Sequence, residues 1–206
     1  MEKLSKEQVL DVANNIFETC DIIAKHGTSI SSAMSIIDTG FDFDKTSMVG
    51  QKSKDPVLLC SYGWKENMRG DATNVILAIP KSFVMKLNNM SESVYEAWKE
   101  SVLEKGSDAE FLFYAVSKEK EDKVIERPSG FPQLPPVIKR NVPKEFIKGF
   151  FVFCDNTNYL DFISNPEEAL NHLSYVENEN FFDNLTMEEQ DKFVAKFKGE
   201  NKSPSR

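Results

Sequence analysis

The chain of 206 residues is long enough for one domain with a sizeable core, and its 40% hydrophobic content favours a globular protein. The formal net charge of -8 disfavours nucleic acid as a partner, and three cysteines without C-x-x-C spacing disfavour a disulfide framework or a zinc site. No apolar run approaches the roughly 18 residues of a membrane span, and the charged N-terminus does not resemble a signal peptide, so the composition predicts a cytoplasmic protein with no membrane partner.

The N-terminal stretch carries a helix signal followed by a strand signal. Ser5-x-x-Gln8 is a capping-box pattern, which predicts a helix over 6–20. The apolar run over 21–25 then predicts a short strand that ends at His26. His26 is therefore predicted to lie at the end of a strand, immediately before the next element.

The stretch after His26 predicts a short capped helix. The side chain of one of three serines can accept a hydrogen bond from the free N–H groups at the start of this helix. The candidates are Ser29, Ser31 and Ser32. Apolar residues then recur at i, i+3, i+4 and i+7, which is one face of a helix. They are Ile30, Ala33, Met34 and Ile37. Gly40 fits the C′ position, where glycine adopts a positive φ without a Cβ clash. The first N–H groups and the positive end of such a helix favour an anion.

The middle of the chain predicts a central strand among less regular segments. Residues 74–80 are apolar on both faces and rich in β-branched side chains, which predicts a strand inside a sheet. Residues 46–50 predict a second, shorter strand, and the polar residues 50–55 predict a loop. Pro56 suits the first turn of a helix.

The second half of the chain combines helix signals with one strong strand. Apolar spacing predicts a helix over 91–104, and 118–136 is a long surface connection because a charge run precedes four prolines. Residues 142–153 predict the next strand. Capping patterns predict that further helices begin at 165–166 and at 186–189.

This order of elements predicts an α+β fold instead of a βαβ series. The sequence has no internal repeat, and too little chain follows the long connection to build a second core. We therefore expect one domain over 1–198 and a disordered polar tail over 199–206.

His26-Gly27-Thr28, followed by a helix that ends in Gly40-Phe41, resembles the first motif of the ADP-ribosyltransferase superfamily, in the branch that includes poly(ADP-ribose) polymerases. The resemblance implies a split antiparallel β-sheet with helical N- and C-terminal segments, and NAD as the substrate. It also implies that His26 hydrogen-bonds the adenosine ribose of NAD and that the Gly27 backbone holds the nicotinamide amide. His26, Gly27 and Thr28 are thus the first predicted NAD-binding residues.

A second block resembles the strand in which this family carries its catalytic glutamate. Residues 142–147, Val-Pro-Lys-Glu-Phe-Ile, match the pattern Pro/Asn-x-Glu-aromatic-Ile, which implies that Glu145 is catalytic. Residues 75–80 resemble the central strand of the family. The family also places a tyrosine or serine beside the nicotinamide, and both Ser47 and Tyr62 are candidates here.

The chemistry fits a carboxylate at position 145 on physical grounds. Breaking the bond between nicotinamide and ribose passes through an oxocarbenium-like centre, as glycoside cleavage does. A carboxylate beside that centre stabilises the positive charge and can deprotonate the acceptor. Glu145 adjoins the apolar residues Phe146 and Ile147, where partial desolvation strengthens its field. The alternative is that Glu145 is a solvated residue at the edge of a strand.

The leading interpretation is an NAD-dependent mono-ADP-ribosyltransferase without a metal site, which transfers ADP-ribose to an unidentified acceptor such as a protein. The first alternative is a non-catalytic fold of the same kind that binds a partner or a nucleotide. The second alternative is a two-histidine phosphoesterase, because both His26-Gly27-Thr28 and His172-Leu173-Ser174 match His-x-Thr/Ser. Such enzymes place both motifs on strands, whereas 167–175 has helical spacing, so we expect only His26 to matter.

Overall fold

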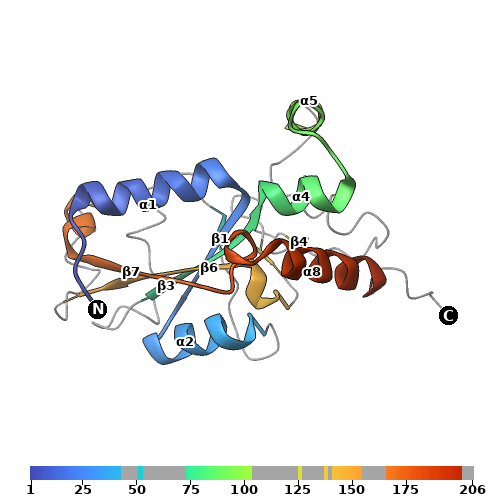
Figure 1. The fold of residues 1–206 in the computed structure, drawn as a ribbon. Coiled ribbons are helices and arrows are strands. Elements are labelled where there is room, and N and C mark those ends of the chain that lie inside the picture. Colours follow the sequence, from blue (N-terminus) through green and yellow to red (C-terminus); the bar gives the residue numbers. More distant parts are fainter. Residues whose placement is uncertain are drawn as a thin grey trace.

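The computed structural model describes these stretches of the chain: 1–42, 51–52, 73–103, 125–126, 137–138, 141–154 and 166–200. An antiparallel sheet of seven strands lies at its centre, in the order β4-β5-β2-β1-β3-β6-β7 (Figure 1). Four strands are long: β1 (Cys20–Thr28), β3 (Thr73–Pro80), β6 (Ile147–Phe153) and β7 (Leu173–Glu177). The others have two residues each: β2 (Gln51–Lys52), β4 (Ile125–Glu126) and β5 (Val137–Ile138). The predicted α+β class is therefore confirmed.

Strand β3 lies between β1 and β6 and is buried along its whole length. This confirms the central strand predicted over 74–80. In the register of the three strands, His26 of β1 lies opposite Val75, and Val75 lies opposite Phe150 of β6. Because paired residues share a face of the sheet, these three side chains point to the same side.

Helix α1 (Lys6–Thr19) covers one face of the sheet (Figure 1). Ser5 caps it as predicted, because its hydroxyl accepts a hydrogen bond from the N–H of Gln8 at 3.2 Å, while the Gln8 side chain accepts one from the N–H of Ser5 at 2.8 Å. Three fully buried residues of the helix pack with apolar side chains of β3 and β6. They are Val9, Ala13 and Ile16.

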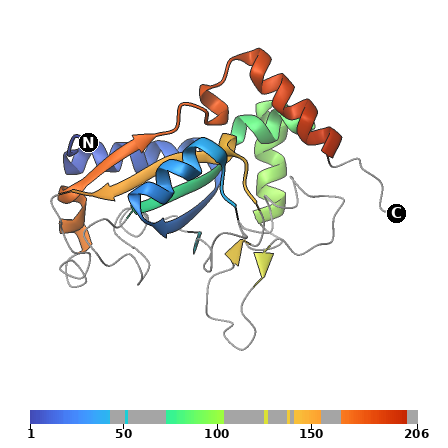
Figure 2. The same cartoon turned by 90° about the horizontal axis from the view of Figure 1, so that it is seen from below.

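Helix α2 (Ile30–Thr39) covers the opposite face, where it returns along β1 after the single residue Ser29 (Figures 1 and 2). Of the three candidate serines, Ser29 is the cap, since its hydroxyl accepts a hydrogen bond from the N–H of Ser32 at 3.2 Å. Ala33 and Ile37 are buried and pack with apolar residues of β3 and β6. The predicted helix is thus confirmed, and so are Ala33 and Ile37 of its apolar stripe, whereas Met34 of that stripe is exposed.

The remaining long helices gather at one end of the sheet (Figure 2): α4 (Lys81–Asn88), α5 (Glu92–Leu103) and α8 (Met187–Glu200). Here Phe83 of α4 meets four other Phe rings edge-on, with centroids between 4.7 and 5.7 Å apart. The predicted cap of α8 is present, because the Glu189 carboxylate accepts a hydrogen bond from the N–H of Thr186 at 2.8 Å. Helix α8 extends to Glu200, two residues beyond the predicted end of the domain at 198, so the tail predicted over 199–206 begins too early.

The strand predicted over 142–153 is shorter than expected. A turn of 3₁₀ helix, η3 (Lys144–Phe146), precedes β6, and in it the N–H of Phe146 donates to the carbonyl of Pro143 at 3.0 Å. Glu145 therefore lies in η3 and not at the start of a strand, which corrects its predicted setting.

The helix predicted over 167–175 is also shorter than expected. Only α7 (Pro166–Ala169) and η5 (Leu170–His172) are helical, and the residues that follow form β7. Helical spacing is a local signal, and here the hydrogen bonds that β7 makes with β6 override it.

The segment between α2 and β3 differs from prediction in one described place. The loop predicted over 50–55 contains β2, which pairs with β1. The strand predicted over 46–50 and the helix predicted from Pro56 lie outside the described residues.

Candidate functional site

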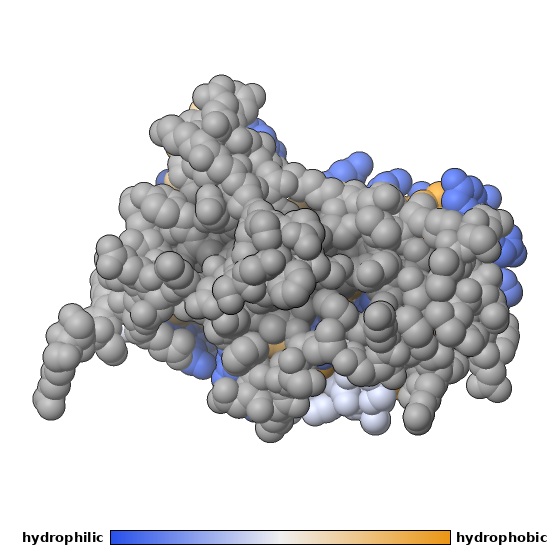
Figure 3. Space-filling model, turned by 180° about the vertical axis from the view of Figure 1, so that it is seen from behind, coloured by the Kyte–Doolittle hydropathy of each residue, from blue (hydrophilic) through white to orange (hydrophobic). Residues whose placement is uncertain are grey.

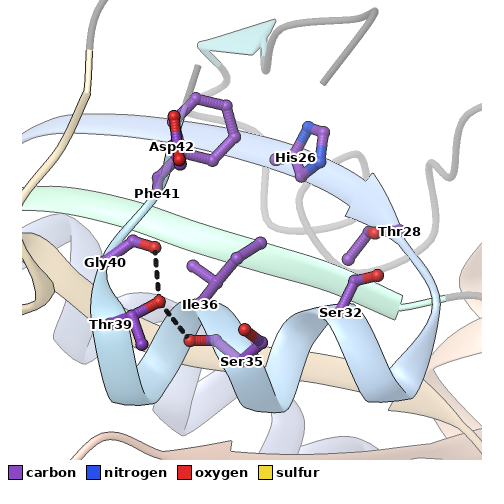
Figure 4. A pocket seen from close by; sticks show the side chains of 9 residues that line it. All are labelled: His26, Thr28, Ser32, Ser35, Ile36, Thr39, Gly40, Phe41 and Asp42. Atoms are coloured by element: carbon purple, nitrogen blue, oxygen red, sulfur yellow. Dashed lines mark hydrogen bonds between the residues drawn. The ribbon is translucent and has the colours of Figure 1, made fainter. Parts of the chain in front are cut away.

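The His-Gly-Thr motif forms the last three residues of β1. Because side chains alternate along a strand, His26 and Thr28 point to the face that α2 covers, while Gly27 presents only its backbone. The chain then reverses at Ser29, and α2 runs back along the strand. Strand and helix become two walls of one cavity (Figure 4).

The cavity between β1 and α2 has a volume of about 180 Å³ and is mostly polar. Three hydroxyl residues, Ser32, Ser35 and Thr39, come from one face of α2, since they are spaced at i, i+3 and i+7. These three residues are exposed, so the cavity opens to solvent. In Figure 3 one patch at the lower edge, right of centre, is pale, the colour of weakly hydrophilic residues. The full lining is His26, Thr28, Ser32, Ser35, Ile36, Thr39, Gly40, Phe41 and Asp42.

His26 forms a buried and uncharged part of the cavity wall. It is only 6% exposed, and burial lowers its pKa from 6.5 to about 4, so its imidazole is neutral at pH 7. The ring of Phe41 meets it edge-on, with centroids 5.0 Å apart. Within the described part of the chain, the Nδ1 atom of His26 has no hydrogen-bond partner. Since a neutral imidazole has one donor and one acceptor, this nitrogen has hydrogen-bonding capacity to offer a ligand.

Gly40 returns the chain to the cavity after α2. Its φ of 90° lies in a region that glycine adopts readily, and a Cβ at this position would lie 2.7 Å from the carbonyl oxygen of Val142. Two backbone hydrogen bonds, of 2.8 and 2.9 Å, then pair Phe41 with Val142. The glycine thus allows Phe41 and Asp42 to complete the wall.

Of the predicted site residues, His26 and Thr28 line the cavity and Gly27 lies between them. Glu145 is half-buried in η3 and is not among the nine lining residues. Its segment is still close to the cavity wall, because only Pro143 separates η3 from Val142, the residue that pairs with Phe41.

The other predicted residues lie away from this cavity or outside the described chain. Ser47 and Tyr62, the candidates beside the nicotinamide, fall outside the described residues. His172 is the last residue of η5, next to β7, and its Nε2 lies 3.7 Å from a carboxylate oxygen of Glu168. Strands β3 and β6 separate β7 from β1, a distance of about 14 Å. The two histidines therefore do not share a cavity.

Sequence reasoning missed the hydroxyl residues of α2 and the acid that follows them. A signal was present, because Ser32, Ser35 and Thr39 repeat at helical spacing beside the apolar stripe. Such a row of small polar residues usually faces solvent. Only the position of β1 beside α2 identifies the row, together with Asp42, as the lining of a cavity.

Fold and site together define an α+β protein with a polar cavity between its first strand and the helix that follows. In comparisons with known proteins, the chain matches no family model, no curated protein and no solved structure. Within the described residues, no helix is both long and apolar enough to cross a membrane, and no group of three or more His, Cys, Asp or Glu residues is placed to hold a metal ion. Function is therefore argued from the cavity.

Proposed function

We propose that this chain is an NAD-dependent mono-ADP-ribosyltransferase-like domain whose cavity holds the adenosine ribose of NAD. The observation that carries the proposal is His26, a buried and neutral histidine in the wall of a hydroxyl-lined cavity, whose Nδ1 atom has no hydrogen-bond partner among the residues that the structure describes. A buried polar atom without a partner destabilises a folded protein, and a ligand that supplies the missing hydrogen bond explains why it is there.

A sugar suits this cavity in size and in chemistry. The volume of about 180 Å³ is the room of about six water molecules, which is enough for a sugar ring but not for a whole dinucleotide. Ribose hydroxyls both donate and accept, so they match a neutral imidazole and the hydroxyls of Thr28 and Ser32. A half-turn of the His26 ring about its Cβ–Cγ bond exchanges its two edges, so the unpaired nitrogen can be turned towards the sugar.

The backbone of Gly27 suits the nicotinamide amide, which offers both donors and an acceptor. The carbonyl of Thr28 accepts a hydrogen bond from the Thr73 hydroxyl at 2.5 Å, so it points towards β3. Because successive peptide groups of a strand alternate in direction, the N–H and C=O of Gly27 point to the other side. There the described pairing of β1 with β2 ends at Lys25. We therefore assign the N–H and C=O of Gly27, on the side of β1 away from β3, to the nicotinamide amide of NAD.

Glu145 is the proposed catalytic carboxylate, with Ser47 or Tyr62 beside the nicotinamide. Its support is chemical, because a carboxylate stabilises an oxocarbenium-like transition state. One observation favours the non-catalytic alternative, a module that binds the nucleotide without turnover: Glu145 is not among the lining residues of the cavity. The proposal therefore needs one experiment for binding and a second for chemistry.

A thermal-shift titration of the full chain with NAD tests binding. A ligand that binds only the folded state raises the free energy of unfolding by about 2.7 kcal/mol at a hundredfold excess over Kd. We expect NAD to raise Tm, His26→Ala to lose this shift, and the matched variant His172→Ala to keep it. The absence of any shift in the wild type at millimolar NAD would contradict the proposal.

Release of nicotinamide separates the enzyme from the binding module. If Glu145 serves the transition state, Glu145→Gln should slow release by about a hundredfold while the affinity for NAD stays nearly unchanged. Glu179→Gln, a change at an exposed glutamate, should alter neither quantity. A wild-type protein that binds NAD but releases no nicotinamide would favour the non-catalytic module.

A further inference from the structure

Two parts of the chain anchor η3, the three-residue turn that carries Glu145. On one side, Phe146 is 3% exposed and meets the rings of Phe83 in α4 and Phe193 in α8 edge-on, with centroids 4.7 and 5.4 Å away. On the other side lies Asn178, which follows β7 and is fully buried. The position of the turn therefore depends on contacts with residues distant in sequence.

The side chain of Asn178 spans the backbone on both sides of Glu145. Its Nδ2 atom donates to the carbonyl oxygens of Lys144 and Ile147 at 2.8 and 2.7 Å, which uses both N–H bonds of the amide. Its Oδ1 atom accepts a hydrogen bond from the N–H of Asn180 at 3.0 Å. These partners fix the orientation of the amide, because only Nδ2 can donate to a carbonyl. One side chain thus fastens the first residue of η3 to the first residue of β6.

These contacts need the two donors of a carboxamide. A smaller side chain at position 178 leaves both carbonyl oxygens without this donor, and η3 loses the contact that joins its start to β6. The ring contacts of Phe146 remain, so the turn stays near its place while its shape is no longer fixed. A catalytic group has to be held within about 0.5 Å of its productive position. The loss of this contact should therefore affect the placement of Glu145.

We propose that Asn178 is a positioning residue for the reaction, which acts through Glu145 by holding η3 in the shape that the carboxylate needs. The inference rests on the proposed function, in which Glu145 is catalytic. Asn178 is not among the nine residues that line the cavity with His26. Its loss should therefore slow the chemical step and leave the binding of NAD unchanged.

A double-mutant cycle on nicotinamide release by the full chain tests this role. Asn178→Ala should lower kcat by about tenfold to a hundredfold, because a small misplacement of a catalytic group is that costly in rate. The Kd for NAD, from isothermal titration calorimetry, should stay within about twofold of the wild type. When the protein also carries Glu145→Gln, Asn178→Ala should lower kcat by less than about twofold, since the group that it positions has already been removed. A merely structural role would lower kcat by the same factor in both backgrounds.

A second variant and a control separate positioning from stability. Asn178→Ser keeps a hydroxyl that can donate to one carbonyl, so its kcat should lie between those of the wild type and Asn178→Ala. The control is Ile16→Ala, which destabilises the protein in the apolar cluster under α1, to which Phe146 does not belong. Its kcat should stay within about twofold of the wild type. Circular dichroism and Tm set an assay temperature at which every variant is folded.

The outcomes separate this inference from the proposed function. The positioning role is overturned, while the proposed function stands, if Asn178→Ala lowers kcat by the same factor in both backgrounds or leaves it unchanged. The same holds if Ile16→Ala lowers kcat as much as Asn178→Ala does. If the wild type releases no nicotinamide, or if Glu145→Gln releases it as fast as the wild type, the catalytic role of Glu145 fails, and the positioning role is overturned with it.

Discussion

The two faces of the sheet are covered by helices that begin alike, yet the described residues differ between them: under α1 they form a buried apolar cluster, here called the filled face, whereas a polar cavity lies beside α2. Helices α1 and α2 both start at a serine cap, Ser5 and Ser29, and both bury an apolar stripe. Beside its stripe, α2 carries a row of hydroxyl residues towards β1, and a cavity remains there. A cap and an apolar stripe thus determine where a helix lies, whereas the residues next to the stripe determine whether the interface is filled.

Each face also holds a buried polar side chain that lacks a hydrogen bond within the described part of the chain. His26 faces α2, and Asn74, which lies opposite Gly27, faces α1. Asn74 is 1% exposed, and neither of its amide atoms has a partner in the described structure. An unpaired buried polar group destabilises a protein by about 1–3 kcal/mol, so both residues lower stability. Of the two, His26 is the one that lines the cavity.

The largest expected effect comes from truncating one isoleucine on each face. Ile16 of α1 is fully buried, whereas Ile36 of α2 is half-buried at the cavity. Ile16→Ala should lower the free energy of unfolding by about 2–5 kcal/mol, because it creates a void in a packed core. Ile36→Ala should lower it by about 1 kcal/mol, because part of that side chain already faces open space. Urea unfolding with an unchanged m-value measures both losses, and equal losses would contradict the comparison.

Local signals in the sequence predict the elements that frame the cavity. The Ser5 cap, the helix that ends before Gly40 and the strand over 74–80 are each specified by neighbouring residues, and the structure confirms each. The strand conformation of 173–177 is not predictable in this way, because it depends on pairing with β6, a partner distant in sequence. Helical spacing in that stretch points to the wrong element.

The site is less predictable than the fold for the same reason. The motif at 26–28 is visible in the sequence, but the burial of His26 depends on Phe41 and on a helix that returns along the strand. The setting of Glu145 is wrong in the sequence-based prediction, because the N–H of Phe146 bonds to the carbonyl of Pro143 and closes a 3₁₀ turn. Neither the ring contact nor the turn leaves a periodic signal.

The second expected effect is a pH dependence that arises on the cavity face. Burial lowers the pKa of His26 from 6.5 to about 4, so between these values the unfolded chain binds a proton that the folded chain does not. The free energy of unfolding should therefore fall as the pH falls from 6.5 to about 4, by about 3 kcal/mol in total. Above pH 6.5 both states are neutral at this residue and the loss disappears.

Comparison with His26→Gln isolates this contribution, because the other ionisable groups are common to both proteins. Urea unfolding at a series of pH values gives the free energy of unfolding for each. The wild type should lose about 3 kcal/mol more than the variant on acidification. Parallel pH profiles would show that the folded protein accepts a proton at His26 as readily as the unfolded chain does.

The smallest expected effect concerns Asn74 on the filled face. Asn74→Val should raise the free energy of unfolding by about 1–3 kcal/mol, because it replaces unpaired polar atoms with an apolar side chain that suits a strand. Asn178 provides the matched control, since it is fully buried but its amide donates to the carbonyls of Lys144 and Ile147 at 2.8 and 2.7 Å. Asn178→Val leaves those carbonyls without this partner and should be destabilising.

Urea unfolding gives the sign of each of these changes, and titration of Asn74→Val with NAD shows what the gain means. Because Asn74 points away from the cavity, the variant should keep the NAD-induced rise in Tm that His26→Ala loses. If Asn74→Val is more stable and NAD still raises its Tm as in the wild type, Asn74 lowers stability without a role in NAD binding. If the variant is more stable but NAD no longer raises its Tm, Asn74 takes part in NAD binding. The conclusion that NAD binds only through the α2 face would then be wrong.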